Sequence, residues 1–246
     1  VMTATPIPRT VAMTVFGDLE TSTLSELPAG RAPIQTNVVP VAQRPGWLDR
    51  AWQRVREEVD KGHQVYVVCP RVEPDKTPDP GAVRLAAVEE QAPALSVGAL
   101  RGLRVDALHG RMPSDEKESV MGAFSRGEVD VLVATTVIEV GVDVGNATMM
   151  VVLDADRFGV SQLHQLRGRV GRGAAQSFCI LLVSSPEAAE RLRIFSSTED
   201  GFRIAEADLQ MRGQGDLFGE RQSGLPAFRF ADLEKDAALL ATARNA

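Results

Sequence analysis

The sequence has few lysines, few cysteines and no long apolar run. Lysine occurs only at positions 61, 76, 117 and 235, and none of the four follows a glycine. The chain therefore contains no G-x-x-x-x-G-K-[ST] loop, the motif whose backbone amides and lysine hold nucleotide phosphates. It also has no acidic box of the DExx type at the end of a predicted strand. Groups that bind ATP phosphates and magnesium must come from elsewhere if this chain takes part in nucleotide hydrolysis.

The other scarcities narrow the class of protein further. No apolar stretch approaches the roughly 18 residues of a membrane span, and no basic segment followed by an apolar one opens the chain. Cys69 and Cys179 both lie in apolar runs, so we expect buried thiols rather than a disulfide or a metal pair. His109 has no second metal ligand at a suitable spacing, and we expect it to have a structural role at a strand end.

Charge is distributed unevenly along the chain. The net charge of −6 argues against a protein that coats nucleic acid without specificity. The segment from Arg157 to Pro186 nevertheless holds four arginines and no acidic residue, which predicts a local basic surface.

A chain of 246 residues is long enough to bury a sizeable core in one large or two small domains. Short apolar runs without period-two alternation are typical of strands buried on both faces of a parallel sheet. Helical patterns alternate with these runs from residue 47 to residue 183, which predicts βαβ units and an α/β fold with helices on both faces of the sheet. The predicted strands cover residues 34–41, 64–69, 105–109, 129–134, 149–154 and 177–183, and the predicted helices cover 11–16, 47–61, 82–97, 114–126, 186–195, 201–211 and 230–246.

Local expectations for three residues accompany these elements. Trp47 and Trp52 lie on a predicted helix, and we expect them to pack in the core rather than to stack on bases. Ser114 precedes Asp115 and Glu116, which is typical of a residue that caps a helix.

Ligands of open α/β sheets bind beyond the carboxyl ends of the strands. We therefore expect residues 135–143 and the segment after Asp154 to lie on one functional rim. Gly141 permits close approach of the backbone, and the Asp143 carboxylate is suited to accept a hydrogen bond from a ribose hydroxyl. Arg111 follows the predicted strand 105–109, where it is suited to hold a nucleic-acid phosphate.

Arg169 and Arg172 are three residues apart, on one helical face or on either side of a turn at Gly171. Two guanidinium groups aimed at one point suit the charge that develops during phosphoryl transfer. An R-x-x-R pair near glycines is more often a solvated loop, so the pair needs its sequence context.

That context resembles a known family. ATTVIEVGVDV at 134–144 followed by QLRGRVGRG at 165–173 resembles the fifth and sixth motifs of superfamily-two helicases. TATP at 3–6 and PRVE at 70–73 are similar to the third and fourth motifs. ELPAGR at 26–31 and the string GFRIAEADLQMRGQGDLFGERQSGLPAFRFADL at 201–233 narrow the resemblance to the RecG branch-migrating DNA helicases. It runs from Thr3 to about Asp236.

The resemblance implies a RecA-like fold of the P-loop NTPase type and a role for named residues. It implies that Arg169 and Arg172 reach ATP phosphates with support from Gln165, and that Gly141, Asp143 and Gly168 line the nucleotide. Thr5 would couple the ATP site to DNA. The residues that would face DNA are Arg71, Arg111 and Thr136, and those of a translocation loop are Arg212, Arg221 and Gln222.

The resemblance also implies cofactors, partners and domains. ATP and Mg²⁺ would be held mainly by a first motor lobe. The partners would be branched double-stranded DNA (forks and Holliday junctions), a wedge domain and first lobe of the same chain, and single-strand-binding protein. The protein would act in the cytoplasm, at the nucleoid. Residues 1–33 would end the first lobe and form a linker, 34–185 would form the second lobe, and 186–246 a helical hairpin, loop and terminal helix. The chain opens without a start methionine, so we expect a fragment that is inactive alone.

Three alternatives remain open from the sequence. The transcription-repair coupling translocase shares the motor and the tail, although ELPAGRAPI and RQSGLPAFRFADL favour RecG. A non-catalytic DNA-binding module would keep the sheet without need of the arginine pair. An RNA helicase would differ in the nucleic acid that stimulates its ATPase.

Overall fold

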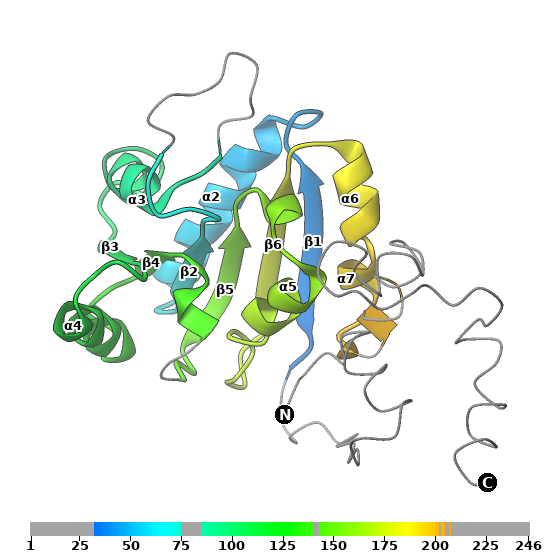
Figure 1. Ribbon diagram of the computed structural model, residues 1–246. Helices are drawn as coiled ribbons and strands as arrows, with labels where there is room; N and C mark the ends of the chain where they lie inside the picture. Colours follow the sequence, from blue (N-terminus) through cyan, green and yellow to red (C-terminus); the bar gives the residue numbers. More distant parts are fainter. Residues whose placement is uncertain (1–31, 75–84, 140–142, 202, 205–206, 208–246) are drawn as a thin grey trace, which may run out of the picture. The chain divides into compact units, whose positions relative to one another are not determined.

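The computed structural model describes residues 32–74, 85–139, 143–201, 203–204 and 207 (Figure 1). By its internal contacts the chain divides into two compact units, Pro28–Glu199 and a unit made of Val1–Leu27 with Asp200–Ala246. In the second unit, described residues 201, 203, 204 and 207 are helical. The sequence-predicted site residues that lie outside the described residues are Thr5, Gly141, Arg212, Arg221 and Gln222.

The larger unit is built on a six-stranded parallel sheet in the order β1-β6-β5-β2-β4-β3. The predicted parallel α/β fold is therefore confirmed, and each predicted strand is present within a few residues of its predicted bounds. The strands are β1 (Ile34–Pro40), β2 (Gln64–Val68), β3 (Val105–Leu108), β4 (Val131–Ala134), β5 (Ala147–Val152) and β6 (Ser177–Val183).

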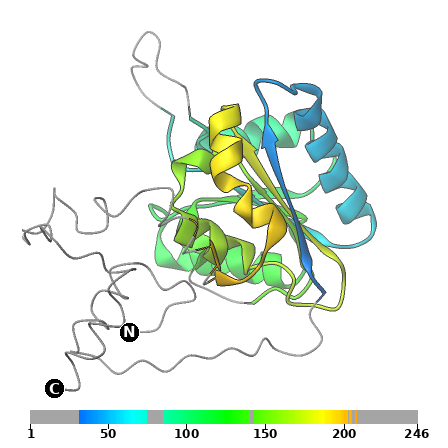
Figure 2. The ribbon, with the colours of Figure 1, turned by 90° about the vertical axis from the view of Figure 1, so that its right-hand side faces the viewer.

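Helices cover both faces of this sheet. Figure 2 shows α2 on one side, and α5, α6 and α7 on the other. Val65 and Val67 of β2 face the side of α2 and α3, whereas Tyr66 faces the opposite side and packs on Phe124 of α4 with ring centroids 4.9 Å apart. The helices are α2 (Gly46–Asp60), α3 (Val88–Val97), α4 (Ser114–Ser125), α5 (Val160–Arg167), α6 (Pro186–Leu192) and α7 (Ile194–Ser197), with short 3-10 helices η1 (Thr136–Glu139) and η2 (Ala155–Arg157).

Burial explains why the central strands lack alternation. All residues of β2, β4 and β5 are buried, because helices exclude water from both faces of the sheet there. The predicted buried state of both cysteines is also confirmed, and burial raises the pKa of the Cys69 and Cys179 thiols to about 12.

Three helix predictions need correction. The helix expected over 82–97 begins only at Val88, after an isolated bridge between Arg71 and Ala87. Ser114 is the first residue of α4 and makes no capping hydrogen bond, since Pro113 occupies the N-cap position. The helix expected over 186–195 is two short helices, α6 and α7, separated at Arg193.

The expectation for the tryptophans is right for one and wrong for the other. Trp52 is 8% exposed and lies in the core cluster between α2 and the sheet. Trp47 is 48% exposed, because it lies in the first turn of α2. The Arg44 guanidinium lies 5.0 Å from the centre of its ring.

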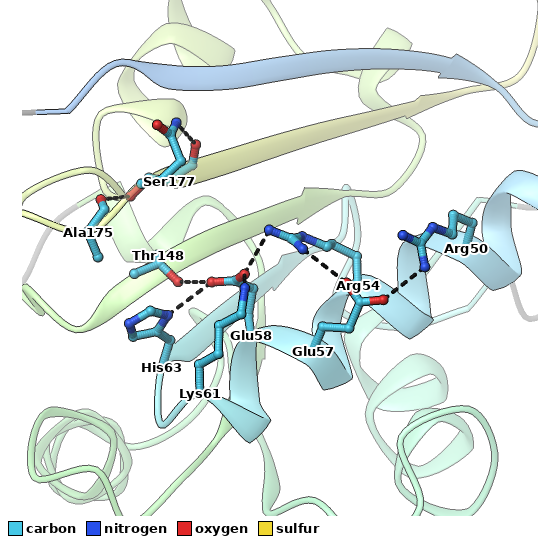
Figure 3. A network of polar contacts seen from close by, with 10 residues as sticks. Arg50, Arg54, Glu57, Glu58, Lys61, His63, Thr148, Ala175 and Ser177 are labelled. Carbon is cyan, nitrogen blue, oxygen red and sulfur yellow. Dashed lines mark hydrogen bonds and ion pairs between the residues drawn. The ribbon is translucent and has the colours of Figure 1, made fainter.

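A buried carboxylate joins the end of α2 to β5 (Figure 3). Glu58 is 1% exposed, and its carboxylate contacts Arg54 at 2.9 Å, Lys61 at 2.8 Å and His63 Nδ1 at 3.0 Å. The Thr148 hydroxyl donates to it at 2.9 Å. Burial raises the pKa of Glu58, but the hydrogen bonds from Lys61, His63 and Thr148 and the charge of Arg54 outweigh burial, so that the pKa is lowered.

None of the helices among the described residues is both long and apolar enough to cross a lipid bilayer.

Candidate functional site

Helix α5 positions the arginine pair. Its buried residues Val160, Leu163 and Leu166 repeat at helical spacing and hold one face on the sheet. At its start, the amide of Gly159 donates to the Gln162 side chain at 3.1 Å, which satisfies one of the unpaired amides of a helix N-terminus. The helix ends at Gly168, so Arg169 and Arg172 lie in the turn that leads to β6.

Two glycines fix the path of this turn. Gly171 has φ +74°, and a Cβ atom there would lie 2.8 Å from Cγ1 of Ile34. A Cβ atom at Gly173 would lie 2.7 Å from the carbonyl oxygen of Gly145. Since Ile34 begins β1 and Gly145 precedes β5, the turn is packed against the amino-terminal edge of the sheet.

Arg172 contacts two other residues that the sequence singled out, Gly168 and Asp143. Its Nε donates to the carbonyl oxygen of Gly168 at 3.0 Å, and its Nη1 forms an ion pair with the carboxylate of Asp143. The Arg172 side chain is 21% exposed and that of Asp143 is 62% exposed. The Asp143 carboxylate is therefore on the solvent side of this ion pair.

Both arginines influence Tyr66 through their charge. Burial raises the pKa of Tyr66 to about 12, while the positive charges of Arg169 and Arg172 both act to lower it. Arg169 and Arg172 lie in the same turn after α5, and their role toward a nucleotide remains a prediction.

Arg167 differs from its two neighbours. It is 2% exposed, and its Nη1 donates to the carbonyl oxygens of Phe195 and Thr198, both at 3.0 Å. Burial lowers its pKa. The predicted basic surface over 157–186 is therefore wrong for this residue, because Arg167 connects α5 to the end of α7 inside the protein.

The carboxyl edge of the sheet carries the residues predicted to face DNA. Arg71 follows β2 and bridges to Ala87, Arg111 follows β3 and forms an ion pair with Glu73, and Thr136 begins η1 after β4. These three side chains follow neighbouring parallel strands, so they lie along one rim.

One expectation about this rim is wrong. Residues 135–143 were expected to lie on one rim beyond the carboxyl ends of the strands, but residues 143–146 lie at the opposite edge, where Asn146 donates from its side chain to the carbonyl oxygen of Gly62 at 2.9 Å. The chain returns toward the start of β5 after η1, and η1 packs against α5 on the way. Gln165 lies in α5 and is half-buried. The sites predicted for nucleotide and for DNA thus occupy different edges, joined by α5 and η1.

A metal site is not apparent in the described part of the chain, which has no group of three or more His, Cys, Asp or Glu residues suited to hold an ion. His109 lies at the end of β3, and its Nε2 is 4.0 Å from Glu89.

Comparison with known proteins identifies the family. The model of the helicase conserved C-terminal domain matches residues 49–174, more than half of the chain. The chain belongs to this helicase family. A second model, domain 3 C-terminal of the ATP-dependent DNA helicase RecG, matches residues 198–246.

Individual helicases agree with these matches. The ATP-dependent DNA helicase RecG of Mycobacterium tuberculosis (strain H37Rv) is 58% identical over 229 residues, which cover 91% of this chain and 31% of the relative. RecG of Bacillus subtilis is 49% identical, over 99% of this chain and 35% of its own length. The structure of RecG bound to a three-way DNA junction has a TM-score of 0.70 and 42% identity, and the match covers 98% of this chain and 30% of that one. The chain thus spans about a third of the length of these helicases.

The helicase match at 49–174 includes Asp143, Arg169 and Arg172. Sequence reasoning missed the buried Tyr66, since a tyrosine inside the apolar run QVYVV carries no signal of its own. Glu58 was missed for a similar reason, since a glutamate in an arginine-rich helix is typical of a solvated face.

Proposed function

We propose that this chain supplies the second motor lobe of an ATP-dependent DNA helicase that remodels branched double-stranded DNA, including stalled forks and Holliday junctions. The observation that carries the proposal is the ion pair of Arg172 with Asp143 beside Arg169, in a turn that two crowded glycines hold in place. The names of the relatives, which cover the chain at 49% to 58% identity, support DNA and ATP as the ligands.

The arginine pair suits catalysis that depends on closure of two lobes. Guanidinium groups on one lobe reach phosphates held by another lobe only when the two approach each other. Where arginine fingers have been measured they are worth about 10³ to 10⁵ in rate. In this chain the Asp143 carboxylate contacts Arg172 where a phosphate oxygen would bind. Since that carboxylate is well exposed, ATP phosphates with their higher charge displace it at little cost.

The first lobe would hold ATP with Mg²⁺ through its own phosphate-binding loop, because this chain has no such loop. The chain's own residues then orient the γ-phosphate and neutralise developing charge. Gly168 and Asp143 line this side of the nucleotide, and Gln165 supports the pair from α5.

At the carboxyl edge, Arg71, Arg111 and Thr136 contact DNA phosphates. Phosphate contacts position a protein without reading sequence, which suits a motor that must pass any sequence. Alternating grip and release of this rim, linked to ATP turnover at the arginine pair, gives movement along the duplex. Residues Arg212, Arg221 and Gln222 would take part in that movement, and a wedge domain and single-strand-binding protein would direct it to forks at the nucleoid.

The test is substitution of each arginine in the complete protein. Arg169→Ala and Arg172→Ala are expected to lower the kcat for ATP by at least about 10²-fold, since each removes a charge aimed at the transition state. Affinity for branched DNA should stay within about twofold, because phosphate contacts at the other edge are intact. Arg193→Ala is the matched control, since Arg193 is 74% exposed and forms a surface ion pair with Glu190.

Steady-state ATPase assays and titration of a labelled three-way junction measure the two quantities. Turnover that survives both substitutions would show that the pair does not act on the nucleotide. Comparison of branched DNA, linear duplex and RNA as stimulators identifies the substrate, and stimulation by RNA alone would contradict a DNA helicase.

A further inference from the structure

The turn that follows β5 has an unusual backbone at Asp154. This residue has φ 47° and ψ 49°, in the left-handed region, and among the described residues other than glycine it alone has a positive φ. The left-handed conformation is unfavourable for an ordinary L-residue, and Asp and Asn tolerate it best. A conformation of this kind persists only where surrounding contacts hold it.

The Asp154 carboxylate makes such a contact. Its Oδ2 accepts a hydrogen bond from the amide of Ala86 at 2.7 Å. Burial raises the pKa of Asp154, although this hydrogen bond acts to lower it. The carboxylate therefore lies in a partly dehydrated place, where a charge-assisted hydrogen bond has more influence on backbone position than at the surface.

Further contacts lead from Ala86 to the rim that carries the DNA-facing residues. The amides of Val88 and Glu89 donate to the carbonyl oxygens of Arg71 and Val72, both at 3.0 Å. The next residue, Glu73, forms an ion pair with Arg111. The positions of Arg71 and Arg111 thus depend on the segment that Asp154 holds.

On its other side, the same turn contacts Ser184 after β6 and helix α6, and it leads into α5. Asp156 accepts from the Ser184 amide at 3.3 Å and from its hydroxyl at 3.1 Å. Arg191 of α6 donates to the carbonyl oxygen of Asp156 at 2.8 Å. Helix α5 begins at Val160, three residues after η2 ends, so a shift of this turn moves the start of α5.

We propose that Asp154 is a positioning residue that couples DNA contact at the Arg71–Arg111 rim to the orientation of α5 and its arginine pair. The coupling rests on the proposed function. When DNA binds, a displacement of the rim reaches the turn through Ala86 and the Asp154 carboxylate. The strained backbone of Asp154 is the point at which the chain turns from β5 toward α5. Loss of the carboxylate should leave both sites intact while DNA no longer stimulates ATP hydrolysis.

Three substitutions in the complete protein separate the carboxylate from the backbone. Asp154→Asn keeps an acceptor oxygen and a residue that tolerates positive φ. Asp154→Gly keeps the backbone conformation and removes the acceptor, and Asp154→Ala removes both. The measurements are ATPase without DNA, ATPase at saturating three-way junction, junction affinity, junction unwinding and melting temperature.

The expected result is a loss of coupling with Asp154→Gly. Stimulation of ATPase by the junction should fall about tenfold, within the usual range for coupling between sites, and unwinding should fall with it. ATPase without DNA, junction affinity and melting temperature should stay near the wild-type values. Asp154→Asn should restore most of the stimulation, and Asp154→Ala should show the same loss of stimulation as Asp154→Gly together with a lower melting temperature.

Three outcomes overturn the coupling. Asp154→Gly that responds to the junction like the wild type shows that the carboxylate transmits nothing. An equal fall of ATPase with and without DNA shows a structural role only. A wild-type protein whose ATPase does not respond to branched DNA overturns the proposed function and the coupling with it, whereas a responsive wild type with a responsive Asp154→Gly overturns the coupling alone.

Discussion

Glu58 offers a sharp test of how this fold is held together. We expect Glu58→Gln to destabilise the 246-residue chain strongly, because the change keeps the shape and removes the charge that Arg54, Lys61 and His63 surround. Removing one partner of a buried ion pair costs about 3 to 5 kcal/mol. Lys61 is 52% exposed and can turn to solvent, so we expect a loss of about 2 to 4 kcal/mol.

The neighbouring residue supplies the control. Glu57 also contacts Arg50 and Arg54, but it is 32% exposed, and solvent screens surface ion pairs, so Glu57→Gln should change stability little. Urea denaturation followed by circular dichroism compares the two variants through the midpoint at constant slope. A Glu58→Gln variant no less stable than Glu57→Gln would refute the reasoning that burial makes the Glu58 charge essential.

The dependence on pH provides an independent check. The pKa of Glu58 is lowered in the folded state, so its charge contributes stability above the unfolded value, about 4.3 for glutamate, and that stability is lost as the pH falls through the folded pKa. The difference in stability between the wild type and Glu58→Gln should therefore be largest near neutral pH and shrink below about pH 4. A difference that does not change between pH 7 and pH 3 would contradict the charge argument.

Two further predictions concern the turn between α5 and β6 and its surroundings. Gly171→Ala should lower the free energy of unfolding by about 2 to 4 kcal/mol, since the new Cβ would lie 2.8 Å from Ile34 at φ +74°. Gly46→Ala is the control and should change stability little, since a Cβ there has nothing within 4 Å. Equal effects of the two substitutions in a denaturation experiment would show that the turn yields easily. Arg167→Ala should lower the free energy of unfolding by about 3 kcal/mol or more, because it leaves the Phe195 and Thr198 carbonyl groups without their charged donor. It should also raise the rate of proteolysis at the end of α7. Unaltered cleavage there would show that Arg167 does not hold α7 to α5.

The order and type of the main elements follow from the sequence because their physical causes are local. Apolar runs such as residues 64–69 and 149–154 are too short for helices and too uniformly apolar for exposed strands, so they fit only the centre of a covered parallel sheet. The placement of Arg169 and Arg172 in one turn is also local, since the two residues are three positions apart in the sequence. Helix starts were less predictable, as Ser114 and the segment before Val88 show, because tertiary contacts such as the Arg71–Ala87 bridge compete with local preferences.

By itself the sequence determined the parallel α/β architecture, the buried cysteines and the neighbouring positions of the two arginines. Only the tertiary structure decided that Asp143 and Arg172 meet at the edge opposite to Thr136, that Arg167 is buried, and that Glu58 is a buried charge. The reason is physical: burial and charge pairing depend on residues brought together from distant strands, such as Thr148 with Glu58 and Asp154 with Ala86, and no local pattern encodes those distances.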